Sequence, residues 1–518
     1  MPIVQANSIN TTALVVPDLY VQIVPPQNLV LNGVPTNVVG VAGSAQWGPV
    51  NQPIVIGDMA AYARTFGAIQ ARKYDMGTHV AIMTQQGASN FRCVRVTDGT
   101  DAAATSTGVS TCITFTALYT GTLGNSISVV ISAGSKASSW RAAVSVPGFF
   151  PEVFDNITGT GNAFWVALAA AINSGTGVQR GASAFITATA GSGSTSVTAA
   201  TMPAFSGGTD GVATPATVAT NLIGVDTIPR TGMYALRGQG CSIGVLADLD
   251  ASSTWTVQNA FGLAEGLYMI CTGPSGDTIA NAVTTKATAG LDSYAVKLMH
   301  GDWIWWTDTV NGAIRLVSPQ PFAAGRLANL SPEQSSLNKP LYGVVGSQKS
   351  GLIPSQVTTY SSAELAALFQ VGIDVISNPQ PGGRFWGVRA GHNSSSNAAT
   401  NGDNYTRMTN YIAATLAAGM GIYVGQVVNQ SLFRRIRATQ LRFLAGMLQQ
   451  GLLGSTDGSL PYNVTCDITN NPDSRTSIGY VQSDTQVKYQ AINEKFIVNV
   501  EGGQTVIVSR QTLPTGRA

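Results

Sequence analysis

Charged side chains are scarce in this sequence. Asp, Glu, Lys and Arg make up 10% of its 518 residues, against a usual share of about 25%. The hydrophobic share of 44% is typical of a folded, globular chain. A surface with so few charges suits a protein whose copies cover one another, although Ser, Thr, Asn and Gln also keep such a surface in water. The net charge of +2 offers no general attraction to nucleic acids or to acidic membranes.

The sequence also lacks the short motifs of common enzymes and metal sites. It has three histidines and no HExxH, GxSxG or Walker-type glycine-rich lysine loop. We therefore predict no catalytic residues, no metal ligands and no cofactor. One enzyme hypothesis stays open, in which Asp248 and Asp250 form a cryptic site at the carboxyl end of a parallel strand, where α/β ligands usually bind. The simpler interpretation is that both are ordinary strand-end or helix-cap residues.

The cysteines and the N-terminal sequence bear on where the chain folds. The five cysteines are scattered and have neither CxxC nor metal-ligand spacing, so we expect reduced core residues in a protein that folds in the cytoplasm. The N-terminal residues lack a basic segment followed by an apolar one, and no window holds about 20 uninterrupted apolar residues. We expect neither a signal peptide nor a membrane span.

Two separated stretches predict one α/β core, residues 26–97 and 216–395. The first contains an apolar strand at 37–43 and a helix that Asp58 caps. The second alternates strands and helices from residue 243 onward, which predicts a parallel sheet with helices on its faces. Later helices are expected after Ser331-Pro332 and after Ser361, where Glu364 completes a capping box.

The composition changes between these stretches and again after them. Residues 98–215 are rich in Ala, Gly, Ser and Thr with alternating runs, which predicts an inserted β-rich lobe. Residues 396–502 predict a C-terminal α+β domain of two helices followed by strands at 462–469 and 477–492. The second helix carries four arginines with few acidic neighbours, a pattern that fits an acidic partner surface or a merely solvated face. These arginines are Arg434, Arg435, Arg437 and Arg442.

Both ends of the chain are expected to form strands. FIVNV (496–500) and TVIVS (505–509) alternate around Gly502 and Gly503, and LYVQIV (19–24) lies between two prolines. Such terminal strands either complete their own sheets or pair with the edge of a neighbouring copy. In the second case residues 1–25 and 503–518 are arms that exchange strands between subunits. The residues predicted to do so are Leu19, Tyr20, Val21, Ile23, Thr505, Val506, Ile507 and Val508.

Taken in order, the motifs resemble the contractile tail sheath proteins of myovirus-type phages. The matching pieces are a small-residue strand with a Gly-Pro turn (33–67), LYTGTLGNSISVVI (118–131), a Leu-rich helix with a Trp-Gly-x-Arg stretch (361–391) and GLLGSTDGSLPYNVTCDITNNP (451–472). They lie in the family's order and extend from residue 33 to residue 472. The sequence departs from the family after the first C-terminal helix, where GIYVGQVVNQ (421–430) replaces a Phe-Glu-Pro-Asn-like segment and the usual Arg pair of the helix is missing.

The resemblance implies a structural subunit and not an enzyme. Many copies would stack as hexameric rings around an inner tail tube in a metastable extended state, and contraction would drive the tube through the host envelope to deliver the genome. The implied partners are the chain itself, the tail tube protein and the baseplate and terminator proteins, with no direct nucleic-acid binding and no membrane insertion. The implied location is the virion tail, assembled in the host cytoplasm. The family places the C-terminal domain beside the tube, so the four arginines become candidate tube contacts.

Three alternatives remain open at this point. The same subunit type occurs in bacterial contractile devices of the pyocin or secretion kind. A low-copy baseplate or adhesin subunit would also be a structural protein. The α/β enzyme with a site at Asp248 or Asp250 is the third.

Overall fold

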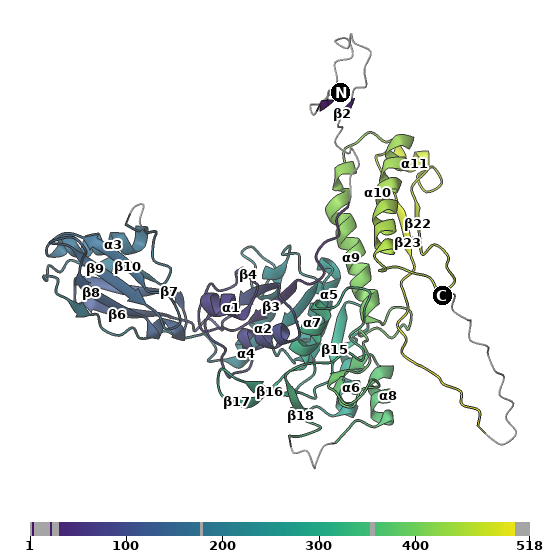
Figure 1. Cartoon of the computed structure of the whole chain (residues 1–518), viewed down its shortest axis with the longest axis horizontal. Coiled ribbons are helices and arrows are strands. Elements are labelled where there is room, and N and C mark those ends of the chain that lie inside the picture. Colours follow the sequence, from purple (N-terminus) through teal and green to yellow (C-terminus); the bar gives the residue numbers. More distant parts are fainter. Residues whose placement is uncertain (1–2, 5–20, 23–30, 177–179, 353–357, 503–518) are drawn as a thin grey trace, which may run out of the picture.

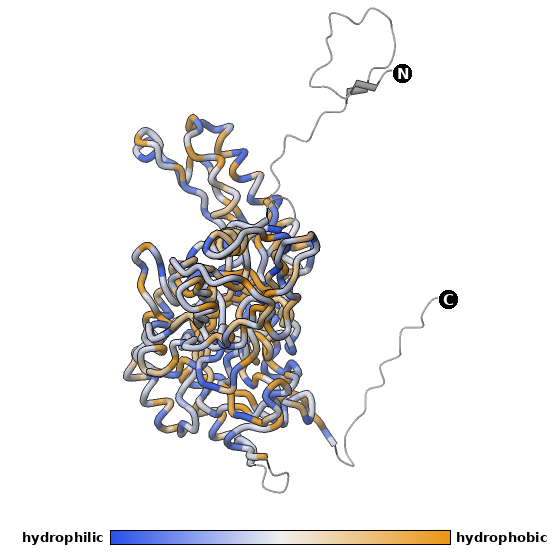
Figure 2. Tube along the Cα trace, turned by 90° about the vertical axis from the view of Figure 1, so that its left-hand side faces the viewer, coloured by the Kyte–Doolittle hydropathy of each residue, from blue (hydrophilic) through white to orange (hydrophobic). Residues whose placement is uncertain are grey.

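A computed structural model describes residues 3–4, 21–22, 31–176, 180–352 and 358–502. A central α/β body lies between a side lobe and an elongated C-terminal part (Figure 1). Apolar segments run through the middle of the body (Figure 2). None of the described helices is long and apolar enough to cross a membrane.

The body is built on a seven-stranded sheet in the order β19-β15-β14-β13-β3-β5-β4. All neighbours are parallel except β4, which is antiparallel to β5. The parallel sheet predicted from the sequence is therefore present, and it unites strands from before and after the side lobe. Its strands are β3 (Val39–Gly43), β4 (Pro53–Ile56), β5 (Phe91–Arg95), β13 (Ile243–Leu246), β14 (Tyr268–Thr272), β15 (Val296–Met299) and β19 (Ile373–Asp374).

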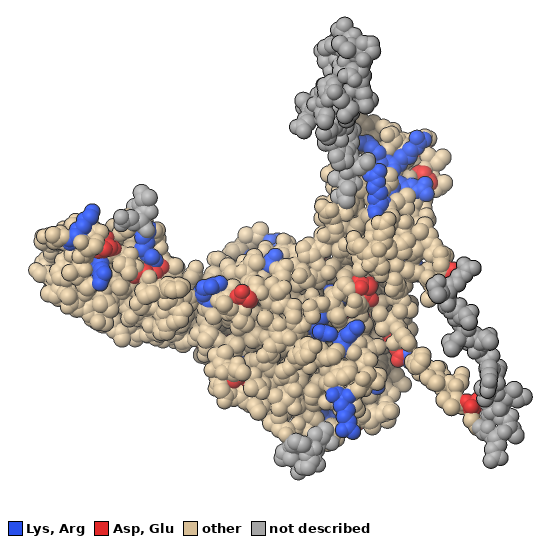
Figure 3. Space-filling view, viewed as in Figure 1, with Lys and Arg blue, Asp and Glu red and all other residues tan. Residues whose placement is uncertain are grey.

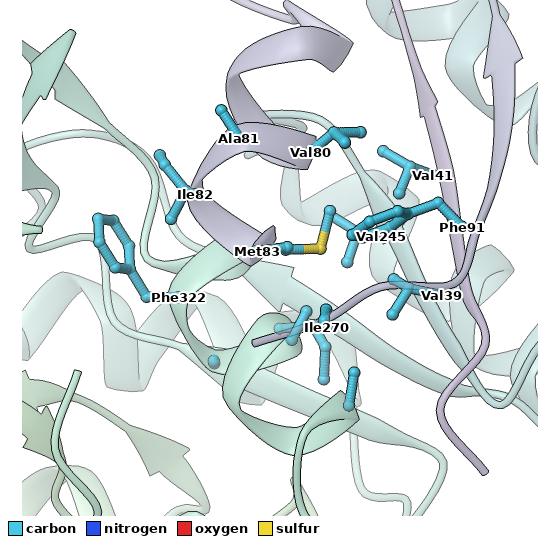
Figure 4. Packing of buried hydrophobic residues seen from close by; sticks show 14 of the residues in the cluster. Val39, Val41, Val80, Ala81, Ile82, Met83, Phe91, Val245, Ile270 and Phe322 are labelled. Atoms are coloured by element: carbon cyan, nitrogen blue, oxygen red, sulfur yellow. The ribbon is translucent and has the colours of Figure 1, made fainter. Parts of the chain in front are cut away.

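Helices cover both faces of this sheet because its strands are apolar on both sides. Val39 and Val41 point to the layer that contains α2 and α7, and Val38 and Ala42 point to the opposite layer. Figure 4 shows the first layer, where side chains of α2 meet Val41 and Val245. The first layer holds α1 (Met59–Phe66), α2 (Met76–Gln85) and α7 (Gln320–Ala328); the second holds α4 (Pro215–Ile223), α5 (Trp255–Glu265), α6 (Ile279–Ala289) and α8 (Ser362–Gln370).

Local sequence signals explain the ends of several helices. Asp58 accepts a hydrogen bond from Ala61 N at the start of α1, and Gly67 ends the helix with a φ of 84°. Ser361 and Glu364 form the predicted capping box of α8. Two smaller sheets complete the body: β17-β16-β18, formed by β16 (Ile304–Asp308), β17 (Ala313–Val317) and β18 (Val344–Ser347), and the pair β20 (Ile376–Ser377) and β21 (Gly387–Val388).

Residues 103–206, which we call the side lobe, have a hydrophobic core of their own. Two antiparallel sheets, β11-β7-β6 and β10-β9-β8-β12, form this lobe together with one helix (Figure 1). Its elements are β6 (Ala103–Val109), β7 (Ile113–Thr120), β8 (Ser128–Ala133), β9 (Trp140–Ser145), β10 (Glu152–Ile157), α3 (Asn162–Ser174), β11 (Ile186–Ala190) and β12 (Ala200–Thr201).

Buried polar contacts fix the root of the side lobe to the body. Arg95, at the end of β5, donates to the carbonyl oxygens of Gly48 and Thr120, each at 2.7 Å. Asp210 accepts from Thr122 N at 2.7 Å. Asp98 N also donates to Gly211 O at 2.7 Å, so the two chain segments that enter and leave the lobe lie side by side.

The C-terminal part packs two long helices against a small sheet. α9 (Asp403–Gly419) runs from the body to the far end of this part, and the short 3-10 helix η6 (Met420–Tyr423) leads into α10 (Gln430–Gln449) (Figure 1). β22 (Tyr462–Thr465) pairs with β23 (Asp484–Val487) in antiparallel register, and the short helix α11 (Asp473–Thr476) lies between them in sequence. Two apolar clusters hold these elements together.

Four local predictions prove wrong. No helix follows Ser331-Pro332, because Arg407 of α9 donates hydrogen bonds to the carbonyl oxygens of Leu330 and Ser331 at 2.8 and 2.9 Å and the chain turns there. The strands expected at 462–469 and 477–492 are restricted to β22 and β23, which pair over only four residues each. Residues 496–500 alternate in sequence but have no strand partner among the described residues.

Little of the predicted strand-exchanging arms can be compared with the structure. Val21 lies in β2 (Val21–Gln22), which pairs in parallel with β1 (Ile3–Val4) as a sheet separate from those of the body. Leu19, Tyr20 and Ile23 lie outside the described residues, as do Thr505, Val506, Ile507 and Val508.

Candidate assembly surfaces

The chain that follows β23 is attached to the body as far as Glu494. Asn404 Nδ2 donates to Gln490 O at 2.9 Å, and Gln490 Nε2 donates to Gly451 O at 3.2 Å. The last attachment is the pair of His392 Nε2 and Glu494 Oε1, 2.8 Å apart. A groove of about 1140 Å³ remains between this segment and the body.

Beyond this attachment the chain exposes an apolar run. Phe496, Ile497, Val498 and Val500 are 81, 80, 63 and 87% exposed. Full burial of such a side chain is worth about 1.5–3 kcal/mol, so leaving four of them in water is unfavourable. An exposed apolar segment of this kind is typical of a chain that buries it against another molecule.

The small sheet of the C-terminal part has two open edges. It consists of β22 and β23 alone, and neither has a further strand partner among the residues that the structure describes. α10 covers one face, where Val464 is buried and Gln440 Oε1 accepts from Ser483 Oγ at 2.7 Å. A two-stranded sheet with one covered face and free edges is a template for added strands.

The four predicted arginines gather on one exposed face of α10. Asn429 caps this helix by accepting from Leu432 N at 2.8 Å, and Leu432, Phe433 and Ile436 are buried on the opposite face. The helical period therefore leaves Arg434, Arg435, Arg437 and Arg442 exposed. Basic side chains gather at this end of the molecule in Figure 3. None of the four forms an ion pair with another described residue.

Asp248 and Asp250 each have a partner within the body. Asp248 is buried beside His79, with Oδ1 3.0 Å from Nε2, and also accepts from Ser318 N at 3.2 Å. Burial alone raises the pKa of Asp248, but His79 and the hydrogen bonds outweigh it and hold that pKa below its usual value. Asp250 pairs with Lys73 at 2.9 Å. These contacts join β13 to neighbouring elements and favour a structural role over a catalytic one.

One buried ionic cluster was not predicted from the sequence. Lys297 of β15 is fully buried, and its ammonium lies 2.7 Å from Asp374 Oδ2 and 3.0 Å from Asp403 Oδ1. Tyr268 OH donates to Asp403 at 2.6 Å. Because Asp403 begins α9, the cluster joins the central sheet to the C-terminal part. A lysine within the apolar strand AVKLM (295–299) was the available signal.

The described residues offer no metal site, since they contain no suitable group of three or more His, Cys, Asp and Glu side chains. The five cysteines are free and buried, in agreement with the prediction. Burial raises the pKa of the Cys93 thiol far above its ordinary value, which makes it unreactive.

Comparison with known proteins connects this fold to one kind of assembly. No protein-family model matches the sequence, and a search of curated proteins finds no match. Solved structures do match. A sheath tail protein from Desulfitobacterium hafniense is 14% identical with a TM-score of 0.56, over 86% of this chain and 92% of that one. A sheath tail protein from Listeria innocua is 13% identical with a TM-score of 0.59, over 89% and 96%.

A third match is the sheath of an extracellular contractile injection system, PVC, in its contracted state. It is 12% identical with a TM-score of 0.53, over 95% of this chain and 99% of that one. The chain thus has the fold of contractile tail sheath proteins, which confirms the resemblance seen in its motifs. The matched proteins are structural sheath subunits and not enzymes, which supports the non-enzymatic interpretation.

Proposed function

We propose that the chain is the subunit of a contractile phage tail sheath. Copies stack in hexameric rings around a tail tube, remain extended until triggered, and then contract to drive the tube through the host envelope for genome delivery. The other partners are the baseplate and tail terminator proteins, and the sheath is part of the virion after assembly in the host cytoplasm. The observation that carries the proposal is the exposed apolar run at 496–500 in a chain with a sheath fold.

The terminal arms, residues 1–25 and 503–518, link the copies in this proposal. They donate strands through Leu19 to Ile23 and Thr505 to Val508, and the open edges of β22 and β23 receive strands from neighbours. Each backbone hydrogen bond of a donated strand contributes about 0.5–1.5 kcal/mol. Several such bonds per copy, repeated along the sheath, keep neighbouring subunits connected while they shift against one another. The four arginines of α10 contact the tube.

Truncation of the C-terminal arm tests the proposal. Deletion of residues 504–518 is expected to leave a folded monomer that forms no polymer, as measured by thermal unfolding, sedimentation and electron microscopy. Deletion of residues 510–518 is the control, because it removes only the residues that follow the strand TVIVS and keeps the strand itself. Polymers of normal length from the larger deletion would refute the arm model.

A sheath of a bacterial contractile device is the second candidate. The likeness to the extracellular injection sheath, which extends over 95% of this chain, favours it. Electron microscopy of particles that contain the chain separates the two candidates. A DNA-filled head on the particle supports the phage tail, and a headless particle supports the device.

A further inference from the structure

Another cavity lies at the carboxyl end of two strands of the central sheet. The loops that follow β14 and β15 contribute to its wall, and because these strands are parallel, both loops leave the sheet at the same edge. Ligands of open α/β sheets usually bind outside this edge. The cavity has a volume of about 970 Å³, and small-molecule sites typically measure about 300–1,000 Å³.

A buried histidine without a side-chain partner lines this cavity. His300 is 4% exposed, and its Nδ1 has no hydrogen-bond partner among the described residues. Its backbone N–H donates to Asp374 O at 2.8 Å, which fixes its position at the end of β15. Burial lowers the pKa of His300, although Asp302 and Asp277 act in the opposite direction. The ring is therefore neutral at pH 7, and one of its nitrogens can accept a hydrogen bond from a ligand.

The charged side chains around the cavity are mostly acidic. Asp302 is 5% exposed and accepts from Lys349 N and from Tyr360 OH, each at 2.8 Å. Glu364 Oε1 accepts from Lys349 Nζ at 2.7 Å. Asp277 lies just before the N-terminus of α6 and offsets the partial positive charge of that helix end. Three carboxylates against one ammonium leave two negative charges without a counter-charge, so the cavity attracts cations and repels anions.

The remaining wall is apolar and comes from two neighbouring helices. Ile279 and Val283 of α6 are four residues apart, as are Ala363 and Ala367 of α8, and all four line the cavity. This spacing places each pair on one side of its helix. α6 and α8 lie side by side (Figure 1). A chain of methylene groups fits between the two apolar surfaces, and the small alanines leave room for it.

We propose that this cavity binds a free aliphatic diamine, with its ammonium groups near the carboxylates and its methylene chain between α6 and α8. The inference is independent of the proposed function. A metal ion fits poorly, because the described residues contain no suitable group of three or more His, Cys, Asp and Glu side chains. A lysine side chain from another copy is too small to fill the cavity, and it brings only one positive charge.

The test is isothermal titration calorimetry of the purified full chain with putrescine, the four-carbon diamine that has an amino group at each end. The four-carbon diol of the same length is the neutral control ligand. The variant Val283→Lys places an ammonium group of the chain in the cavity. Its matched control is Thr284→Lys, which adds the same charge to α6 at the next, exposed position. Asp277→Asn removes one of the carboxylates, and thermal unfolding shows whether each variant is folded.

Putrescine is expected to bind the wild type and Thr284→Lys with similar affinity. Its binding to Val283→Lys and to Asp277→Asn should be about tenfold weaker or less. The diol should bind the wild type at least about tenfold more weakly than putrescine does. If Val283→Lys does not fold, Asp277→Asn decides.

Three results would overturn the inference. The first is the absence of binding heat with millimolar putrescine and the wild type. The second is equal affinity of the wild type for the diamine and the diol, or of all variants for the diamine. The third is loss of polymerisation of the wild type in saturating putrescine, which would assign the cavity to a basic side chain of a neighbouring copy.

Discussion

Lys297 is the residue on which the junction between the body and the C-terminal part depends. Its burial alone lowers the pKa of the ammonium, but Asp374 and Asp403 outweigh burial and raise that pKa above its ordinary value. Burial likewise acts to raise the pKa of Asp403, whereas Lys297, Ser336 and Tyr268 bring it below its usual value. The charged cluster is therefore stable as an ionic group, and it fixes the start of α9 to the central sheet.

Replacement of Lys297 by Met should destabilise the protein strongly. The substitution leaves two carboxylates buried without their counter-charge, and removal of one partner from a buried pair typically costs about 3–5 kcal/mol. The same substitution at Lys73, which pairs with Asp250 near the surface, should cost less than about 1 kcal/mol. Chemical denaturation of the two variants measures the difference. Equal losses of unfolding free energy in the two variants would show that the Lys297 cluster stabilises the protein no more than the surface pair does.

The buried carboxyl group of Asp75 should make the stability of the protein depend on pH. Burial raises its pKa to about 6, although Thr78 and Arg72 act in the opposite direction. An unfolded aspartate titrates near about 3.9. The folded state therefore binds its proton more tightly, so this residue makes the free energy of unfolding fall as pH rises from about 4 to about 6.

The variant Asp75→Asn should remove this dependence. The amide oxygen can still accept from Thr78 N, as Asp75 Oδ2 does at 2.8 Å, and it carries no charge at any pH. Relative to the wild type, the variant should gain up to about 3 kcal/mol across the interval from pH 4 to about pH 6. Denaturant titrations at several pH values measure this gain. Parallel stability curves for the two proteins would contradict the prediction.

At the scale of elements, the open edge of β23 gives a direct test of strand exchange. Lys488 N donates to Pro461 O at 2.7 Å, and the register runs from Tyr462↔Val487 to Thr465↔Asp484. Hydrogen-bonded and non-hydrogen-bonded pairs alternate in an antiparallel ladder, so the N–H of Thr485 points away from β22. It is available to a strand from another copy.

Thr485→Pro should block polymerisation and spare the monomer. Proline removes the outward N–H, and an edge strand tolerates proline better than a central one does. Thr485→Val is the matched control, because both variants lose the 3.2 Å contact of Thr485 Oγ1 with Gln440 Oε1 but only valine keeps the N–H. Sedimentation of both variants measures polymer formation. Polymers from the proline variant would show that this edge receives no strand.

Sequence patterns correctly predicted the elements whose structure depends mainly on residues close to them in the sequence. The parallel sheet followed from apolar strands that alternate with capped helices, as at Asp58 and Ser361. The turn at Ser331 was not predicted, because it depends on Arg407, which is distant in sequence and donates a hydrogen bond to the carbonyl oxygen of Ser331. The run at 496–500 has strand-like alternation, but a strand needs a partner, and its own chain supplies none among the described residues.

The same contrast applies to the candidate surfaces. The arginine face of α10 could be predicted because helical spacing alone defines it. The exposed apolar side chains of the loop at 421–430 could not be predicted, because the inward orientation of Tyr423 depends on Thr439, sixteen residues later. The role of the arms stays a prediction, since most of their residues lie outside the described part.

At the scale of the whole molecule, the low charge predicts how assembly responds to salt. With 10% charged residues and a net charge of +2, the chain is expected to form contacts between copies that depend on backbone pairing and apolar burial. Raising the salt from about 0.1 M to about 1 M shortens the Debye length from about 10 Å to about 3 Å and weakens exposed charge pairs. We expect the critical concentration for polymerisation without tubes to change less than threefold, which is about 0.65 kcal/mol. Light scattering across the salt series measures it, and a steep salt dependence would point to ionic contacts between copies.

The paired ends of the side lobe have a practical consequence. Because Asp98 and Gly211 are hydrogen-bonded neighbours, the two ends of the lobe lie close together, and its removal leaves a gap that a short linker spans. A foreign domain with adjacent termini can be spliced in at the same point without moving β5 or β13. Assemblies of such chimeric subunits would display an enzyme or an antigen without any redesign of the central sheet.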